Sequence, residues 1–176
     1  MLDYRNDPLL GSALEYWEQA RGARFAPCRA DIKAAQFRTQ LRHMQFIDVV
    51  DDGSGMLHFR YRMTGSTLVE IFGSEFAGKF VEDLFDGQKR RVMNELYNSI
   101  CEARRPVFVH CHYRAVKGLV FKSNRLYFPL SEDGETVTMI MGVLLFLSPY
   151  SFAGEWSSAD VDIDSMLKDI VPPPAN

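Results

Sequence analysis

Nine consecutive residues, 139–147, are apolar apart from Gly142, and they constrain the fold more than any other segment. A helix that spans a bilayer needs about 20 such residues, so this stretch is too short to cross a membrane. It is apolar at odd and even positions alike, and a strand with that pattern is buried on both faces, inside a sheet. The sequence therefore predicts a folded domain with a sheet whose central strand lies late in the chain.

Four further strands are predicted from period-two alternation of apolar and polar residues. The clearest is 56–64, which follows a glycine-rich turn at 51–55 and forms a hairpin with the strand before it. In this strand Leu57, Phe59, Tyr61 and Met63 share one face, whereas His58, Arg60 and Arg62 share the other. The five predicted strands are 45–50, 56–64, 107–116, 119–130 and 136–147.

Helices are predicted before the first strand and between the second and third. Ser12 with Glu15 forms a capping box for a helix that ends at Gly22, and a second helix is expected from Asp31 to Arg42. Short helices over 65–85 are punctuated by Gly65, Gly73 and Gly78, expected at positive φ, and the longest helix runs from about 88 to 104. This order predicts an α+β fold, a five-stranded antiparallel sheet with helices on one face and an N-terminal helical extension. The expected domains are an extension (1–42), a sheet domain (43–148) and an acidic, proline-containing tail (149–176).

The charge balance excludes electrostatically driven nucleic-acid binding. The chain has 176 residues, with 20 basic and 23 acidic side chains and a net charge of -3. Charged residues and Pro8 occupy the N-terminus where a signal peptide needs an apolar stretch, and the three cysteines show no paired spacing. We therefore expect a cytoplasmic protein.

Several short motifs resemble those of a known family. Residues 60–65 read RYRMTG, residues 71–73 read IFG and residues 76–79 read FAGK, with YW at 16–17, PCRADI at 27–32 and YFPLS at 127–131. Together with the order of elements, they resemble a PAS domain of a family common in alphaproteobacteria. The resemblance covers about residues 12–148. It implies a fold with the last strand at the sheet centre and a pocket between the sheet and its helices.

The resemblance implies a sensory or regulatory module without catalysis, which binds a small apolar ligand or a protein partner. Tyr61 and Tyr113 would orient a ligand in the pocket, although the same side chains are equally compatible with a filled core. A chain of this length leaves no room for a kinase or cyclase output domain, so we expect the signal to pass to another polypeptide or a second copy. The candidate pocket residues are Phe59, Tyr61, Met63, Phe72, Leu84, Val92, Leu96, Cys111, Tyr113 and Met141.

Known PAS cofactors and metal chemistry find little support in the sequence. Light-sensing flavin relatives carry a cysteine-containing stretch before the long helix, and 80–88 has no cysteine. Haem relatives usually place a histidine on that helix, and 88–105 has none. The cofactor is therefore left open, with flavin and haem disfavoured. His110 and His112 share a strand face with metal-ligand spacing, but no carboxylate follows at a helpful interval, so surface histidines are the preferred interpretation.

Two alternatives to a ligand sensor remain. One is a ligand-free adaptor that acts through protein contacts, and the other, less favoured, is a small enzyme or metal site using His110 and His112. Self-association is expected through the N-terminal helix, with Leu14, Tyr16 and Trp17 as dimerisation candidates. The competing interpretation is that this helix packs back on its own sheet.

Overall fold

The computed structural model describes residues 7–38, 40–114 and 120–147, with side chains described for 7–38, 40–110 and 123–147. In this part of the chain, no helix is long and apolar enough to span a bilayer. The elements are α1 (Pro8–Arg21), the 3-10 turns η2 (Arg29–Asp31), η3 (Ala34–Phe37) and η4 (Leu41–His43), β1 (Met44–Asp51), β2 (Leu57–Thr64), α2 (Ser66–Phe72), α3 (Val81–Leu84), α4 (Gly87–Ala103), β3 (Val107–Arg114), β4 (Val120–Leu130) and β5 (Met139–Phe146).

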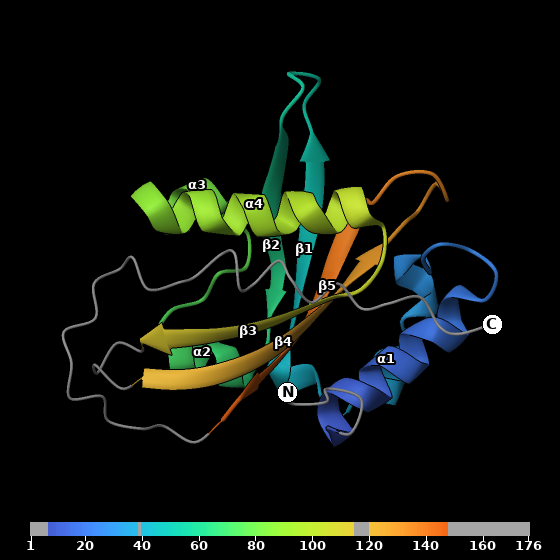
Figure 1. Cartoon of the computed structure of the whole chain (residues 1–176), viewed down its shortest axis with the longest axis horizontal. Coiled ribbons are helices and arrows are strands. Elements are labelled where there is room, and N and C mark those ends of the chain that lie inside the picture. The colour runs from blue at the N-terminus through green and yellow to red at the C-terminus, as the bar shows by residue number, and fades with distance from the viewer. Residues whose placement is uncertain (1–6, 39, 115–119, 148–176) are drawn as a thin grey trace.

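The five strands form one antiparallel sheet in the order β2-β1-β5-β4-β3. The last strand, β5, lies between β1 and β4, and its residues 139–144 are all buried. The prediction that the late apolar stretch forms the central strand is therefore confirmed. The β1–β2 hairpin extends beyond the rest of the sheet, and α4 crosses in front of it (Figure 1).

The helix α1 begins earlier than the Ser12 capping box predicts. The Asp7 carboxylate accepts hydrogen bonds from the backbone N–H groups of Leu9 and Leu10 at 2.9 and 3.0 Å, and Pro8 favours the first turn. The Ser12 hydroxyl instead donates to the Pro8 carbonyl within the helix, at 2.6 Å. The Asp7 carboxylate caps the helix in place of Ser12, so the helix begins at Pro8.

The second predicted helix, Asp31–Arg42, is replaced by the three 3-10 turns η2 to η4. Side chains instead bind backbone groups around the start of this segment. The Asp31 carboxylate accepts from the Cys28 N–H at 3.0 Å, and the Tyr16 hydroxyl donates to the Asp31 carbonyl at 2.9 Å and accepts from the Lys33 N–H at 3.1 Å. Local side-chain hydrogen bonds of this kind compete with helix formation.

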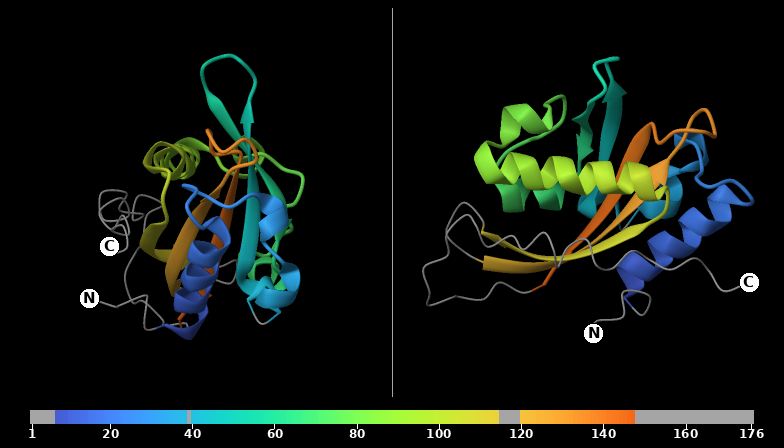
Figure 2. Two further views of the ribbon diagram at one scale, coloured as in Figure 1. Left: turned by 90° about the vertical axis from the view of Figure 1, so that its right-hand side faces the viewer. Right: turned by 45° about the horizontal axis from the view of Figure 1, so that its top comes forward.

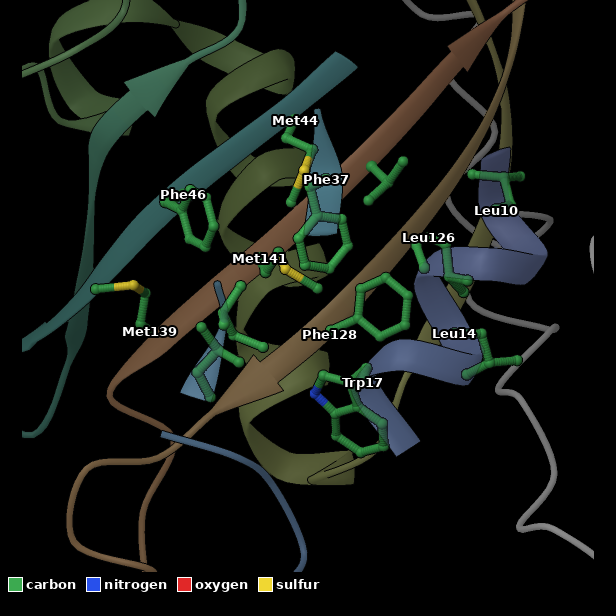
Figure 3. Close-up of a cluster of buried hydrophobic side chains, with 14 of the residues drawn as sticks. Leu10, Leu14, Trp17, Phe37, Met44, Phe46, Leu126, Phe128, Met139 and Met141 are labelled. Carbon is green, nitrogen blue, oxygen red and sulfur yellow. The ribbon is translucent and has the colours of Figure 1, made fainter. Parts of the chain in front are cut away.

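Both faces of the sheet are covered. One face packs against α3 and α4, as expected, and the opposite face packs against α1 (Figure 2, right). Trp17 on α1 lies against Phe128 of β4, with ring centroids 5.9 Å apart, and its indole N–H donates to the Pro129 carbonyl at 2.9 Å (Figure 3). The α+β prediction is confirmed, and the N-terminal extension supplies a second helical layer.

This packing bears on the residues predicted to mediate dimerisation. Leu14 and Trp17 are buried in the chain's own core, and Tyr16 is half-buried with its hydroxyl bonded to the connector after α1. The structure has the competing arrangement, in which the helix packs on its own sheet because its apolar stripe matches the apolar face of β4 and β5. Leu14 and Trp17 are thus buried within the chain and Tyr16 is partly exposed, and self-association through this helix stays a prediction.

Candidate functional site

Six of the ten predicted pocket residues gather between the sheet and α4. Phe59, Tyr61, Val92 and Leu96 are fully or almost fully buried there, and Phe72 and Leu84 are partly buried against the same cluster. We call this cluster the α4-side core. The strand alternation of β2 and the helical spacing of α4 bring these residues to one place, as predicted.

Met63 and Met141 were predicted for the same pocket, and the structure places both on the opposite face, which α1 covers. In β2, a register shift pairs Phe46 with Met63 but Ile47 with Tyr61, so one extra residue reverses the alternation before Met63. In β5, the alternation puts Ile140 in the α4-side core and its neighbour Met141 with α1 (Figure 3). The side chains of Cys111 and Tyr113 lie outside the described residues.

The α4-side core contains a pair of hydroxyl groups. The Tyr61 and Tyr97 hydroxyls are 2.8 Å apart and fully buried, and burial raises the pKa of both tyrosines above the ordinary value. The Gln45 amide donates to the Tyr127 hydroxyl at 3.4 Å, and the Tyr97 and Tyr127 rings meet edge to face. The side chains of the domain itself therefore satisfy these polar groups. The polar role of Tyr97 was not predicted, because its position on the apolar stripe of the helix marks it only as core.

Arg60 and Arg62 form the polar outer face predicted for β2. Both guanidinium groups bind the nearly buried Asp48 carboxylate on β1, at 3.0 Å and 2.7 Å. Both guanidinium groups of this face are therefore paired with the same carboxylate.

His58 and His110 each lie beside polar side chains. The His110 ring lies 2.7 Å from the Asn124 side-chain oxygen, and the His112 side chain lies outside the described residues. His58 lies between two carboxylates, 3.4 Å from Asp52 and 3.5 Å from Glu82. Among the side chains that the structure describes, no three histidine, cysteine or acidic residues could hold a metal ion together.

An open groove of about 840 Å³ runs beside α4, and we call it the α4 groove. One wall is a stripe of α4, the second is the end of the β1–β2 hairpin together with α3, and the third is the turn between β4 and β5. The α4 groove was not predicted, because its walls come from three segments that are separated in the sequence. Its lining is Val49, Asp51, Gly55, Met56, Leu57, His58, Glu82, Arg90, Asn94, Asn98, Cys101, Glu102, Arg104, Glu135, Thr136, Val137 and Thr138.

The α4 groove combines an apolar floor with polar walls. Val49, Leu57 and Val137 line it and also belong to or pack against the α4-side core. Two lining residues, Glu82 and Asn94, each have a buried side-chain oxygen atom without a hydrogen-bond partner among the described residues. Convergent polar groups over an apolar floor are the usual composition of a small-molecule site.

Cys101 also lines the α4 groove. Burial, with a smaller effect of the neighbouring Glu102, raises the pKa of this thiol to about 12. The thiolate is the reactive form of cysteine, so Cys101 contributes a small apolar surface to the groove and is a poor nucleophile near neutral pH.

Comparisons with known proteins place this geometry in a family. A family profile described as PAS domain matches residues 6–145, and no curated protein matches the sequence. Similar solved structures include the light state of the Aureochrome1 LOV domain, a blue-light photoreceptor (TM-score 0.45, 13% identity, covering 64% of this chain and 86% of that chain). Others are the LOV protein of Rhodobacter sphaeroides (TM-score 0.42, 10% identity, 60% and 59%) and VqmA bound to DPO (TM-score 0.45, 11% identity, 65% and 58%).

The family match spans most of the chain and includes α1, the sheet and α4. It agrees with the sheet order, in which the last strand lies beside the first. The sequence motifs that resembled a PAS domain lie within the matched range. The chain belongs to the PAS domain family.

Proposed function

We propose that the chain is a sensory or regulatory PAS module that binds a small molecule in the α4 groove and has no catalytic activity of its own. The observation that carries this proposal is the groove, which is lined by two helices, a hairpin and a turn, and has the α4-side core as its floor. The interior pocket predicted from the sequence is the weaker candidate, because the Tyr61 and Tyr97 hydroxyls pair with each other there.

The helix α4 connects the proposed ligand to the rest of the domain. On one side, Asn94 and Asn98 line the groove, and on the other, Leu96 and Tyr97 are fully buried in the α4-side core. A ligand that favours one position of α4 therefore also favours one packing of that core. Ligand binding would act by shifting the population between two packings, which changes a surface read by another polypeptide.

NMR spectroscopy of the isotope-labelled full chain tests the proposal. We expect a set of chemically diverse fragments to include compounds that shift the backbone signals of α4, of the hairpin end and of the β4–β5 turn. Asn98→Trp should abolish these shifts because the indole fills the groove. Glu95→Trp is the matched control, since Glu95 is exposed on α4 outside the groove. Shifts confined to the buried tyrosines, or no fragment binding, would overturn the proposal.

The second candidate function is a ligand-free adaptor. Met56, at the end of the protruding hairpin, is 66% exposed and is the exposed large apolar side chain in the described part of the chain. A partner protein could cover this side chain. In that case, Met56→Ser would weaken partner binding, whereas the fragment set would leave the α4 groove unaffected.

A further inference from the structure

The His58 ring on β2 lies between two carboxylates that come from different segments. Its Nε2 atom is 3.4 Å from Asp52, in the turn after β1, and its Nδ1 atom is 3.5 Å from Glu82 on α3. The His58 side chain is 31% exposed and the Glu82 side chain 23% exposed. Solvent protons therefore reach the ring, while water screens the contact with Glu82 only in part.

The neutral form of the ring cannot donate to both carboxylates. A neutral imidazole has one N–H donor and one nitrogen that only accepts, so one of the two carboxylates faces a lone pair. The imidazolium has an N–H group on each nitrogen and a positive charge, so it can donate to Asp52 and Glu82 at the same time. Protonation therefore converts a mismatched arrangement into two charge-assisted contacts.

The Glu82 carboxylate has a particular need for a cation. Its Oε2 atom is buried without a hydrogen-bond partner among the described residues, and its Oε1 atom faces His58. A carboxylate that is partly removed from water is costly unless a donor or a cation compensates it. The neighbouring Asp83 does not compete for the ring, because its carboxylate accepts from the Phe80 N–H at 2.8 Å.

The other charges around the ring do not replace its proton. Arg60, two residues along β2, is bound to Asp48, and Arg104 lies over the Phe25 ring. Carboxylates outnumber guanidinium groups along the groove that His58 also lines, so a positive charge on the ring enters an acidic region. The remaining charged residues of this lining are Asp51 from the hairpin, Arg90, Glu102 and Arg104 from α4 and its C-terminal end, and Glu135 from the β4–β5 turn.

We propose that protonation of His58 ties the β1–β2 hairpin to α3 and makes this corner of the domain responsive to pH. Asp52 and His58 belong to the same hairpin, so the contact between His58 and Glu82 is the one that joins two separate elements. This tie goes beyond the proposed function, because it needs no ligand. The hairpin end and α3 form one wall of the α4 groove, so the position of that wall depends on the proton.

A double-mutant cycle tests the tie. The unchanged chain, His58→Gln, Glu82→Gln and the double variant are unfolded in urea at about pH 5.5 and about pH 8, on either side of the ordinary range of histidine titration. We expect the two side chains together to favour the folded state by a factor of about two to five at the lower pH, and by less than about 1.5 at the higher pH. The cycle cancels the pH dependence of all other groups.

NMR spectroscopy of the full chain gives a local measurement of the same tie. Between the two pH values, the backbone signals of α3 should shift together with the ring signals of His58, and they should stay in place in His58→Gln. His110→Gln is the matched control, because the His110 ring lies beside Asn124 on β4. This control should retain the full response of α3.

Two results would overturn the proposal. One is a coupling between His58 and Glu82 that is equal at both pH values, and the other is an α3 response that persists in His58→Gln. Both measurements are made without a ligand, so their outcome is independent of whether fragments bind in the α4 groove.

Discussion

The buried contact between the Tyr61 and Tyr97 hydroxyls shows how a polar pair is accommodated in an apolar interior. Each hydroxyl is the other's partner at 2.8 Å, and edge-to-face contacts with Phe76 and Tyr127 surround the pair. Buried hydroxyl groups are tolerated when they are hydrogen-bonded, so the two residues depend on each other. The same pair connects β2 with α4.

Removing one hydroxyl of this pair should destabilise the fold. In Tyr61→Phe the Tyr97 hydroxyl loses its partner while it remains buried, and we expect the free energy of unfolding to fall by about 1–3 kcal/mol in urea denaturation. The double variant Tyr61→Phe with Tyr97→Phe removes both hydroxyls and should recover part of the loss. A double variant with the full sum of the two single losses would show that the hydroxyls do not act as a pair.

High pH should also weaken the fold. Burial raises the pKa values of Tyr61 and Tyr97, and it raises that of Cys101 to about 12. Above the ordinary pKa values of about 8.5–10, the unfolded chain releases protons that the folded chain retains. The free energy of unfolding should therefore fall with rising pH, by up to about 1.4 kcal/mol per pH unit for each group.

Urea denaturation at a series of pH values between about 8 and 11 measures this slope. The double variant Tyr61→Phe with Tyr97→Phe should show a shallower slope, because only Cys101 remains of the three groups. An unchanged slope in the double variant would contradict the assignment to the tyrosines.

At the scale of elements, the turn between β2 and α2 depends on close packing. Gly65 has φ -65°, so the positive φ predicted from the sequence is wrong here, although Gly73 and Gly78 do have positive φ values of 74° and 85°. A Cβ atom at Gly65 would instead overlap the carbonyl oxygens of Leu41 and Arg42. Glycine is required because two backbone segments approach each other closely.

Gly65→Ala should therefore be strongly destabilising. The overlapping atoms belong to the backbone of η4 and cannot rotate away as a side chain can, so we expect a loss of about 1–3 kcal/mol or more in thermal or urea unfolding. Gly53→Ala is a useful comparison, because its Cβ meets no atom within 4 Å and only the positive φ opposes it. A smaller loss at Gly65 than at Gly53 would refute the packing explanation.

The elements also show what the sequence can and cannot predict. The helix α4 was predicted to within one residue at each end, because its apolar stripe is regular and Pro106 follows it. The faces of Met63 and Met141 were predicted wrongly, because a β-bulge changes the alternation without a signal in the sequence and because a strand apolar on both sides has no distinguishable faces. The α4 groove could not be predicted, since it exists only where distant segments meet.

At the scale of the molecule, α1 should contribute to the same cooperative unit as the sheet. Trp17→Ala removes a buried side chain that packs on Phe128 and donates a hydrogen bond to the Pro129 carbonyl. We expect the free energy of unfolding to fall by about 3–5 kcal/mol, and unfolding to remain a single transition. Glu15→Ala is the control on the exposed side of α1 and should change it by less than about 0.5 kcal/mol. A separate early transition for α1, with an unchanged main transition, would contradict this expectation.

Phe25, in the segment between α1 and η2, packs against two hydrophobic clusters. One is the α4-side core, and the other lies between α1 and the opposite face of the sheet. Arg104, which lines the groove at the end of α4, lies over the Phe25 ring. Thermodynamic linkage makes such an arrangement reciprocal. If a ligand in the α4 groove changes the packing equilibrium of Phe25 by some factor, that packing change alters the ligand's affinity by the same factor. The coupling free energy can therefore be measured either at Phe25 or at the groove.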